Sequence, residues 1–187
     1  MEWILNITKD WNKLGHLVND DGDQFWGTEI DDPKLRYTHS VFALIDRAPF
    51  APIVIHGIEI DDHPYAQVLD SINGVKLFRG DFSLYGLHLS SKPVTKIFMP
   101  FSLFEHNVDY RSLCIHHEAL LVGSYNIENN EFHILQRKCG SVVEVEKNSL
   151  EAEIVDLPLE QYLEERLSKV ASSEKWVRTY SELAARM

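Results

Sequence analysis

Three short strand-like runs in the second half of the chain constrain the fold more than any other feature of this sequence. They occupy residues 119–125, 131–135 and 142–145 and consist mainly of aliphatic and aromatic residues. Turn-forming segments at residues 126–130 and 138–141 separate them. Runs of this length joined by short loops are typical of neighbouring antiparallel strands. The pattern therefore predicts an antiparallel meander.

Strand-like runs also precede the meander, at residues 52–60, 75–78 and 82–86. A short helical pattern lies among them, because the apolar residues of segment 64–72 fall at helical spacing and Pro64 suits a first helical turn. We expect Asn73 and Gly74 to end this helix, with Gly74 at the C′ position. Segment 92–111 is ambiguous, and one interpretation is a strand followed by a loop.

Two amphipathic helices are expected after the meander. In the first, which starts near Pro158, the apolar face consists of Leu159, Tyr162, Leu163 and Leu167. In the second, which starts at Ser172 or Ser173, it consists of Trp176, Val177, Tyr180, Leu183 and Ala184. Strands followed by helices favour the α+β class. We therefore expect a single α+β domain over residues 1–187, with a mostly antiparallel or mixed sheet, flanking helices and a C-terminal helix pair.

The charge of the chain limits the partners it can bind. Its 187 residues include 18 basic and 29 acidic ones, which gives a net charge of −11. Such a chain is poorly suited to binding nucleic acid directly or to an anionic membrane surface, since both depend on Lys and Arg. It is suited to a cationic partner. No secretory signal and no long apolar run is visible, so we expect a cytoplasmic protein.

The N-terminal region, residues 1–46, contains an acidic stretch. Between Asn19 and Asp32 the chain has six acidic residues and no basic one. We take this segment as a candidate partner-binding surface, consisting of Asp20, Asp21, Asp23, Trp26, Glu29, Asp31 and Asp32. Trp26 and Phe25 could be aromatic anchors for a partner. The competing interpretation is a solvated loop, with at least one of these aromatic residues in the core.

No residue pattern predicts a cofactor, a metal ion or a catalytic centre. His116, His117 and Cys114 are ligand-type residues, but we expect the two histidines on a strand, where neighbours point to opposite faces. Zinc motifs, a nucleophile elbow and phosphate-binding loops are missing from the sequence. We therefore expect no enzyme, although a hydrolytic unit assembled only in space remains a third, weaker hypothesis. Cys114 and Cys139 are expected to be reduced thiols, and a bridge between them stays open.

Four sequence features in a fixed order resemble the SUKH superfamily. The first is the helix that ends in Asn-Gly and leads into strands, residues 64–87. The others are the glycine-ended strand at residues 121–124, the Gly-x-Val strand at 139–145 and the terminal helix at 157–163. The resemblance covers residues 60–170. Residues 1–46 do not match the usual short leading helix, and the helix in residues 171–187 is an addition to a SUKH-like core at 47–170.

The resemblance implies an α+β domain with a mixed sheet and no shared catalytic residues. Most bacterial members of this superfamily are immunity proteins, which bind and neutralise a cognate toxin, often a nuclease. Other members are regulatory interaction proteins. We therefore expect a stoichiometric inhibitor of a protein toxin, with a basic nuclease domain as one candidate. The alternative is an intracellular scaffold or regulatory module on the same fold, and the oligomeric state is not readable from the sequence.

Overall fold

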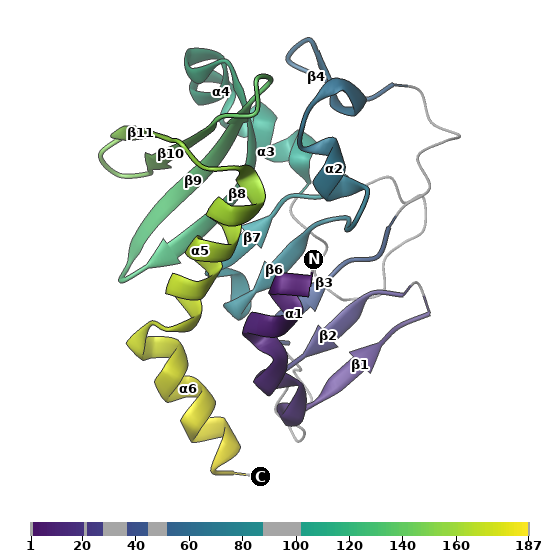
Figure 1. Cartoon of the computed structure of the whole chain (residues 1–187), viewed down its shortest axis with the longest axis vertical. Helices are drawn as coiled ribbons and strands as arrows, with labels where there is room; N and C mark the ends of the chain where they lie inside the picture. Colours follow the sequence, from purple (N-terminus) through teal and green to yellow (C-terminus); the bar gives the residue numbers. More distant parts are fainter. Residues whose placement is uncertain (1, 21, 28–36, 45–51, 88–101, 187) are drawn as a thin grey trace.

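The computed structural model describes residues 2–20, 22–27, 37–44, 52–87 and 102–186. Within them the chain forms one nine-stranded sheet, in the order β1-β2-β3-β6-β7-β8-β9-β10-β11, and a separate β4-β5 hairpin (Figure 1). Every strand pair is antiparallel. Helices pack on this sheet, so the predicted α+β fold of a single domain is confirmed.

The strands of the large sheet are β1 (His16–Val18), β2 (Gln24–Trp26), β3 (His39–Val41), β6 (Val75–Leu77), β7 (Phe82–Leu84), β8 (Ala119–Ile127), β9 (Asn130–Arg137), β10 (Val142–Glu146) and β11 (Ala152–Val155). The hairpin consists of β4 (Val54–Ile55) and β5 (Ile58–Glu59). The α-helices are α1 (Glu2–Thr8), α2 (Ala66–Leu69), α3 (Leu103–Asp109), α4 (Arg111–His117), α5 (Leu159–Ala171) and α6 (Glu174–Ala184). Three short 3-10 helices are η1 (Lys9–Leu14), η2 (Ile60–Asp62) and η3 (Phe78–Gly80).

The predicted meander is confirmed as β8, β9 and β10. Glu128 and Asn129 connect β8 to β9 and both have positive φ, 53° and 71°, as a two-residue hairpin turn requires. The register pairs Ser124 with His133 and His133 with Val145. Successive side chains of a strand point to opposite faces, so this register decides which side chains share a face.

The two faces of the sheet carry different helices. Helices α1, α5 and α6 lie on one face, and α3 and α4 lie on the other (Figure 1). The apolar stripe of α5 is buried as predicted, with Tyr162, Leu163 and Leu167 inside the core. The stripe of α6 is narrower than predicted, because Val177 and Ala184 are exposed. Helix α6 packs mainly on η1 and on α5, which cover only part of its circumference.

The N-terminal region continues the sheet. Strand β3 pairs with β6, with Ser40 opposite Lys76 and Val41 opposite Val75. Helix α1 packs against α5, near the opposite end of the chain (Figure 1). The described part of residues 1–46, a region predicted to be atypical of the family, therefore shares one sheet and one core with the segment that resembles it.

One local prediction is wrong. Helix α2 ends at Leu69, well before Gly74, so Gly74 does not occupy its C′ position. Gly74 has φ 91° and lies so close to the residues that follow β7 that a Cβ atom would come within 2.8 Å of the Gly86 nitrogen. Because Gly74 has no side chain, its backbone can approach the backbone of Leu84 and Gly86 closely. In segment 92–111, which the sequence left ambiguous, residues 103–109 form α3 rather than a strand and loop, and residues 92–101 lie outside the described part of the chain.

Candidate functional site

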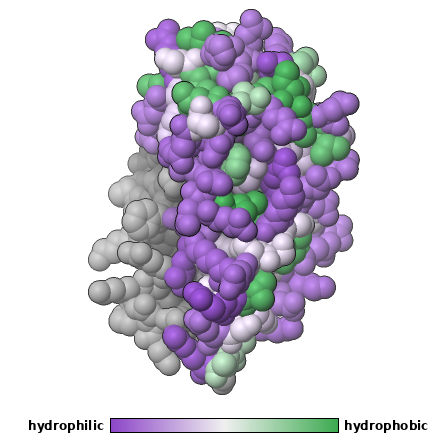
Figure 2. Space-filling view, turned by 90° about the vertical axis from the view of Figure 1, so that its left-hand side faces the viewer, coloured by the Kyte–Doolittle hydropathy of each residue, from purple (hydrophilic) through white to green (hydrophobic). Residues whose placement is uncertain are grey.

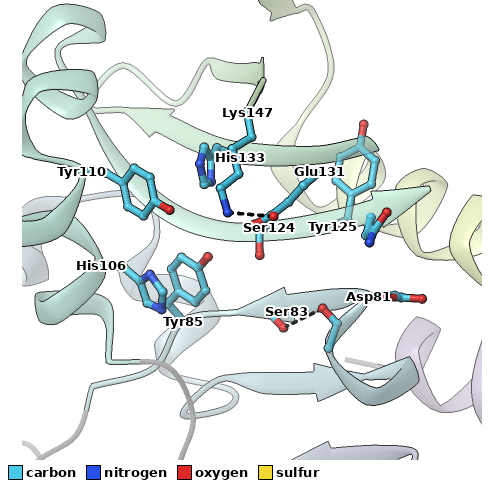
Figure 3. A pocket seen from close by; sticks show the side chains of 12 residues that line it. Asp81, Ser83, Tyr85, His106, Tyr110, Ser124, Tyr125, Glu131, His133 and Lys147 are labelled. Carbon is cyan, nitrogen blue, oxygen red and sulfur yellow. Dashed lines mark hydrogen bonds and ion pairs between the residues drawn. The ribbon is translucent and has the colours of Figure 1, made fainter. Parts of the chain in front are cut away.

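A cavity of about 270 Å³ opens on the face of the sheet that carries α3 and α4 (Figure 3). Strands β7, β8 and β9 form its floor, the end of α3 forms one wall, and the residue after β10 reaches over it. The side chains at its centre are Ser83, Tyr85, His106, Tyr110, Ser124, Glu131, His133 and Lys147. We take this cavity as the candidate functional site.

The cavity exists because one face of three neighbouring strands is polar. Ser83, Ser124 and His133 stand in one row, since each is paired with the next across the strands. Further along the same face, Leu121 and Leu135 are paired and fully buried, where α3 and α4 cover the sheet. The apolar cover thus ends where the polar row begins, and the sheet face is left open there.

His133 is the least satisfied side chain of the cavity. It is 2% exposed, and neither ring nitrogen has a hydrogen-bond partner among the described residues. Burial lowers the pKa of His133 to about 4, with the Glu131 carboxylate opposing the shift and Lys147 adding to it. The ring is therefore neutral near pH 7 and presents one donor and one acceptor. An unpaired buried group of this kind costs about 1–3 kcal/mol of stability.

The charged groups of the cavity are already paired. Lys147 Nζ donates to Glu131 Oε2 at 2.8 Å, and this hydrogen bond raises the pKa of Lys147 (Figure 3). At the rim, Asp81 Oδ2 accepts hydrogen bonds from Lys175 Nζ at 2.5 Å and from the Trp176 indole at 2.7 Å. Each carboxylate that lines the cavity therefore has a cationic partner, and the site carries little net charge.

Aromatic rings line one side of the cavity. The rings of Tyr85 and His106 are stacked with centroids 4.1 Å apart, and Tyr110 packs against His133 at 4.5 Å. Burial lowers the pKa of His106 and raises that of Tyr85, so both side chains are neutral near pH 7. The hydroxyl groups of Tyr85 and Tyr110 point toward the cavity (Figure 3). The site is therefore neutral and rich in hydroxyl groups.

A second buried polar cluster lies on the opposite face, between the sheet and α5. Glu144 Oε2 accepts hydrogen bonds from the Tyr162 hydroxyl and from Arg166 Nε, both at 2.7 Å. Burial by itself raises the pKa of Glu144, but hydrogen bonds from Tyr162, Tyr125 and Arg166 outweigh it and lower the pKa. The Arg166 guanidinium also lies 4.9 Å from the centre of the Tyr162 ring. The charged groups of this cluster are paired and largely buried, so we interpret the cluster as structural.

The predicted partner-binding segment is only partly exposed. Asp20 is exposed, but the Asp23 carboxylate accepts hydrogen bonds from Asn19 Nδ2 at 2.9 Å and from the Ala43 backbone at 2.8 Å. Trp26 is 1% exposed and stacks on His39, which corrects its assignment as a partner anchor. Phe25 is equally buried, so both aromatic residues belong to the core. Of the other predicted residues, Asp21, Glu29, Asp31 and Asp32 lie outside the described part of the chain.

The residues considered as metal ligands do not lie on a strand as expected. His116 and His117 end helix α4, and their rings are 4.7 Å apart. Among the residues that the structure describes, no group of three His, Cys, Asp or Glu side chains is placed to hold a metal ion. Cys114 is buried and Cys139 is exposed, and both are free thiols. The bridge that the sequence left open is therefore not formed.

Sequence reasoning did not find the cavity. A signal was present, because polar residues alternate with apolar ones in residues 83–85, 124–126 and 131–133. Such alternation places the polar residues of each strand on one face. Its meaning depends on the register of the three strands, which the sequence does not state.

Comparisons with protein-family models, curated proteins and solved structures found no match to this chain. None of the described helices is long and apolar enough to cross a membrane.

Proposed function

We propose that this protein is a cytoplasmic immunity protein that binds a cognate bacterial toxin stoichiometrically and blocks it. The proposal is supported by the order of SUKH-like sequence features between residues 60 and 170. It is also supported by the net charge of −11, which suits a basic, phosphate-binding toxin such as a nuclease.

The observation that carries the proposal is an exposed acidic strip formed by residues 151–165. It contains six acidic residues and no basic one, and all six are exposed. They are Glu151, Glu153, Asp156, Glu160, Glu164 and Glu165. The strip includes the edge strand β11 and the outer side of α5, and Figure 2 shows that this side of the molecule is mostly hydrophilic.

The strip has the features that association with a basic protein requires. Clustered carboxylates attract a cationic partner and raise the association rate, an effect that salt screens. Ile154 and Leu150 are 60% and 65% exposed beside these carboxylates. They offer apolar area that a partner can bury. The acidic N-terminal segment that begins at Asp20 is a second candidate surface.

The test begins with the tagged full-length protein, captured from its native host at moderate salt, with bound proteins identified by mass spectrometry. We expect one stoichiometric partner with a basic toxin domain. The purified partner is then titrated with this protein in an activity assay, and inhibition should be complete at one equivalent. A housekeeping partner whose activity is unaffected would contradict the proposal and favour the scaffold alternative.

Charge variants locate the surface. We expect Glu151→Gln, Glu153→Gln, Glu160→Gln and Glu164→Gln together to slow association by about tenfold or more at low salt. The matched control neutralises Glu59, Asp61, Asp62 and Asp70, four exposed acidic residues around η2 and α2, and should leave the rate within about twofold. A third set, Asp20→Asn, Asp31→Asn and Asp32→Asn, tests the N-terminal segment. Equal rates for all three sets and the unaltered protein would exclude both acidic surfaces.

A further inference from the structure

We propose that the cavity between α3 and strands β7–β9 is a binding site for a small, neutral, polyhydroxylated molecule of the monosaccharide class. The proposal is independent of toxin binding, because it concerns a different part of the molecule. It rests on the His133 ring, the charge balance of the cavity and the groups that point into it.

The first observation is the unpaired His133 ring. It is 98% buried, lines the cavity, and has no hydrogen-bond partner on either nitrogen among the described residues. A neutral imidazole offers one donor and one acceptor. Both nitrogens are closed to solvent, so the ring must turn toward the cavity when a ligand binds. Because a hydroxyl group both donates and accepts, a ligand with neighbouring hydroxyl groups then satisfies the ring.

The second observation is the charge balance. Glu131 is paired with Lys147, and Asp81 is paired with Lys175, so no lining carboxylate is left without a cation. His133 and His106 are both held neutral by burial near pH 7. An anionic ligand would meet the two carboxylates, and a cationic ligand would compete with the two lysines for them. A neutral ligand avoids both costs.

The third observation is the chemistry and size of the lining. Hydroxyl groups of Ser83, Ser124, Tyr85 and Tyr110 surround the space, and the Glu131 carboxylate offers a further acceptor. Its volume of about 270 Å³ lies just below the usual range of small-molecule sites, which suits a ligand the size of one sugar ring. Polar groups that converge on a partly enclosed space are the usual mark of such a site.

Packing alone does not explain this arrangement. On the same face of the sheet, the neighbouring pair Leu121 and Leu135 is fully buried under α3 and α4. Apolar side chains therefore fit this face next to position 133. A histidine at position 133 leaves two polar atoms unsatisfied where an apolar side chain would leave none. A bound hydroxylated ligand gives these atoms partners.

The test is a titration of the full-length protein with neutral sugars, followed by NMR of the histidine side chains and the backbone amides. The probes are glucose, galactose, mannose and ribose, with glucuronate and glucose 6-phosphate as charged counterparts and uridine as a planar comparison. We expect at least one neutral sugar to cause saturable shifts of the His133 ring and the Ser124 amide. We expect glucuronate and glucose 6-phosphate to bind about tenfold more weakly than that sugar.

Matched variants separate this site from non-specific effects. His133→Leu should weaken sugar binding by about tenfold or more, and the same substitution at the exposed His116 should leave it unchanged. Ser124→Ala is a milder change in the same row of side chains and should weaken sugar binding by about threefold. It replaces His133→Leu as the test variant if His133→Leu does not fold. The proposal is wrong if no neutral sugar gives saturable shifts up to about 50 mM. Tighter binding of the anions or of uridine, or binding unaffected by both cavity variants, would also overturn it.

Discussion

The two faces of the sheet each carry a buried polar cluster, and the two clusters differ in how their hydrogen bonds are satisfied. Under α5, Glu144 accepts hydrogen bonds from Tyr162 and Arg166, and the ion pair is largely buried, with the Arg166 and Glu144 side chains 13% and 11% exposed. On the opposite face, His133 is as deeply buried but has no hydrogen-bond partner among the described residues, and a cavity lies beside it.

This difference separates a structural cluster from a candidate binding site. In the paired cluster, the hydrogen bonds hold α5 on the sheet. Removing one partner leaves the remaining polar groups buried without hydrogen bonds, which lowers stability. Where a buried group is unpaired, the folded protein gains little from that group itself. Substitutions in the first cluster should therefore cause large losses of stability. Substitutions in the second cluster should mainly weaken ligand binding.

The largest expected effect is at Glu144. Glu144→Leu leaves the Arg166 guanidinium buried without its carboxylate, so we expect a loss of about 3–5 kcal/mol in the free energy of unfolding. Urea denaturation measures this loss. Replacing Arg166 by Leu as well should recover a large part of it, because no unpaired charge remains.

The matched control is Glu131→Leu in the other cluster. The Glu131 and Lys147 side chains are 41% and 38% exposed, so breaking this pair should cost less than about 1 kcal/mol. Similar losses for the Glu144 and Glu131 variants would contradict the distinction between the two clusters.

Lowering the pH should reduce the free energy of unfolding by an intermediate amount. Burial lowers the pKa of His39 to about 3 and that of His133 to about 4, so the unfolded chain binds protons at these residues before the folded protein does. Their stabilising contribution is complete above the unfolded pKa of about 6.5 and is lost as the pH falls below it. Between pH values of about 7 and about 5, each should remove about 1–2 kcal/mol of stability.

Urea denaturation at several pH values tests this expectation. His133→Leu removes one of the two buried histidines, so its stability should fall by about 1–2 kcal/mol less than that of the unaltered protein over that pH interval. The depressed pKa of Glu144 acts mainly below the ordinary pKa of a glutamate, 4.5, and so contributes little in this interval. A variant with the same pH dependence as the unaltered protein would show that His133 is not held neutral.

The smallest expected effect on stability is that of His133→Leu near neutral pH. The substitution removes no hydrogen bond to a described residue and replaces two unsatisfied nitrogens by apolar atoms. We therefore expect the free energy of unfolding to change by less than about 1 kcal/mol, or to rise. Thermal unfolding near pH 7 measures it, and a loss of several kcal/mol would assign His133 a structural role.

Local pattern was sufficient to predict the meander and the apolar face of α5. In the meander, each strand is a short apolar run bounded by turn residues, and neighbouring strands pair along the chain. In α5, the spacing of Tyr162, Leu163 and Leu167 already defines a buried stripe. Both features depend on contacts close in sequence, which is why the α+β class could be predicted.

Two other predictions failed because a neighbour distant in sequence decided the outcome. Trp26 lies within an acidic segment, but β2 is paired between β1 and β3, and the side chain packs on His39 in the core. Val177 has the spacing of an apolar stripe, but the partners of α6 do not reach it. Burial of a side chain depends on what packs against its element, and the periodicity of one segment does not contain that information.

The sequence by itself determined the fold class, the meander, the terminal helices and the acidity of the chain, because propensity, periodicity and charge are local properties. Only the tertiary structure decided where the candidate site lies. Ser83, Ser124 and His133 come from three strands, and the hydrogen-bond register of β7, β8 and β9 alone places them in one row. A shift of one residue in that register would turn a strand's polar side chains to the opposite face, and the cavity would not form.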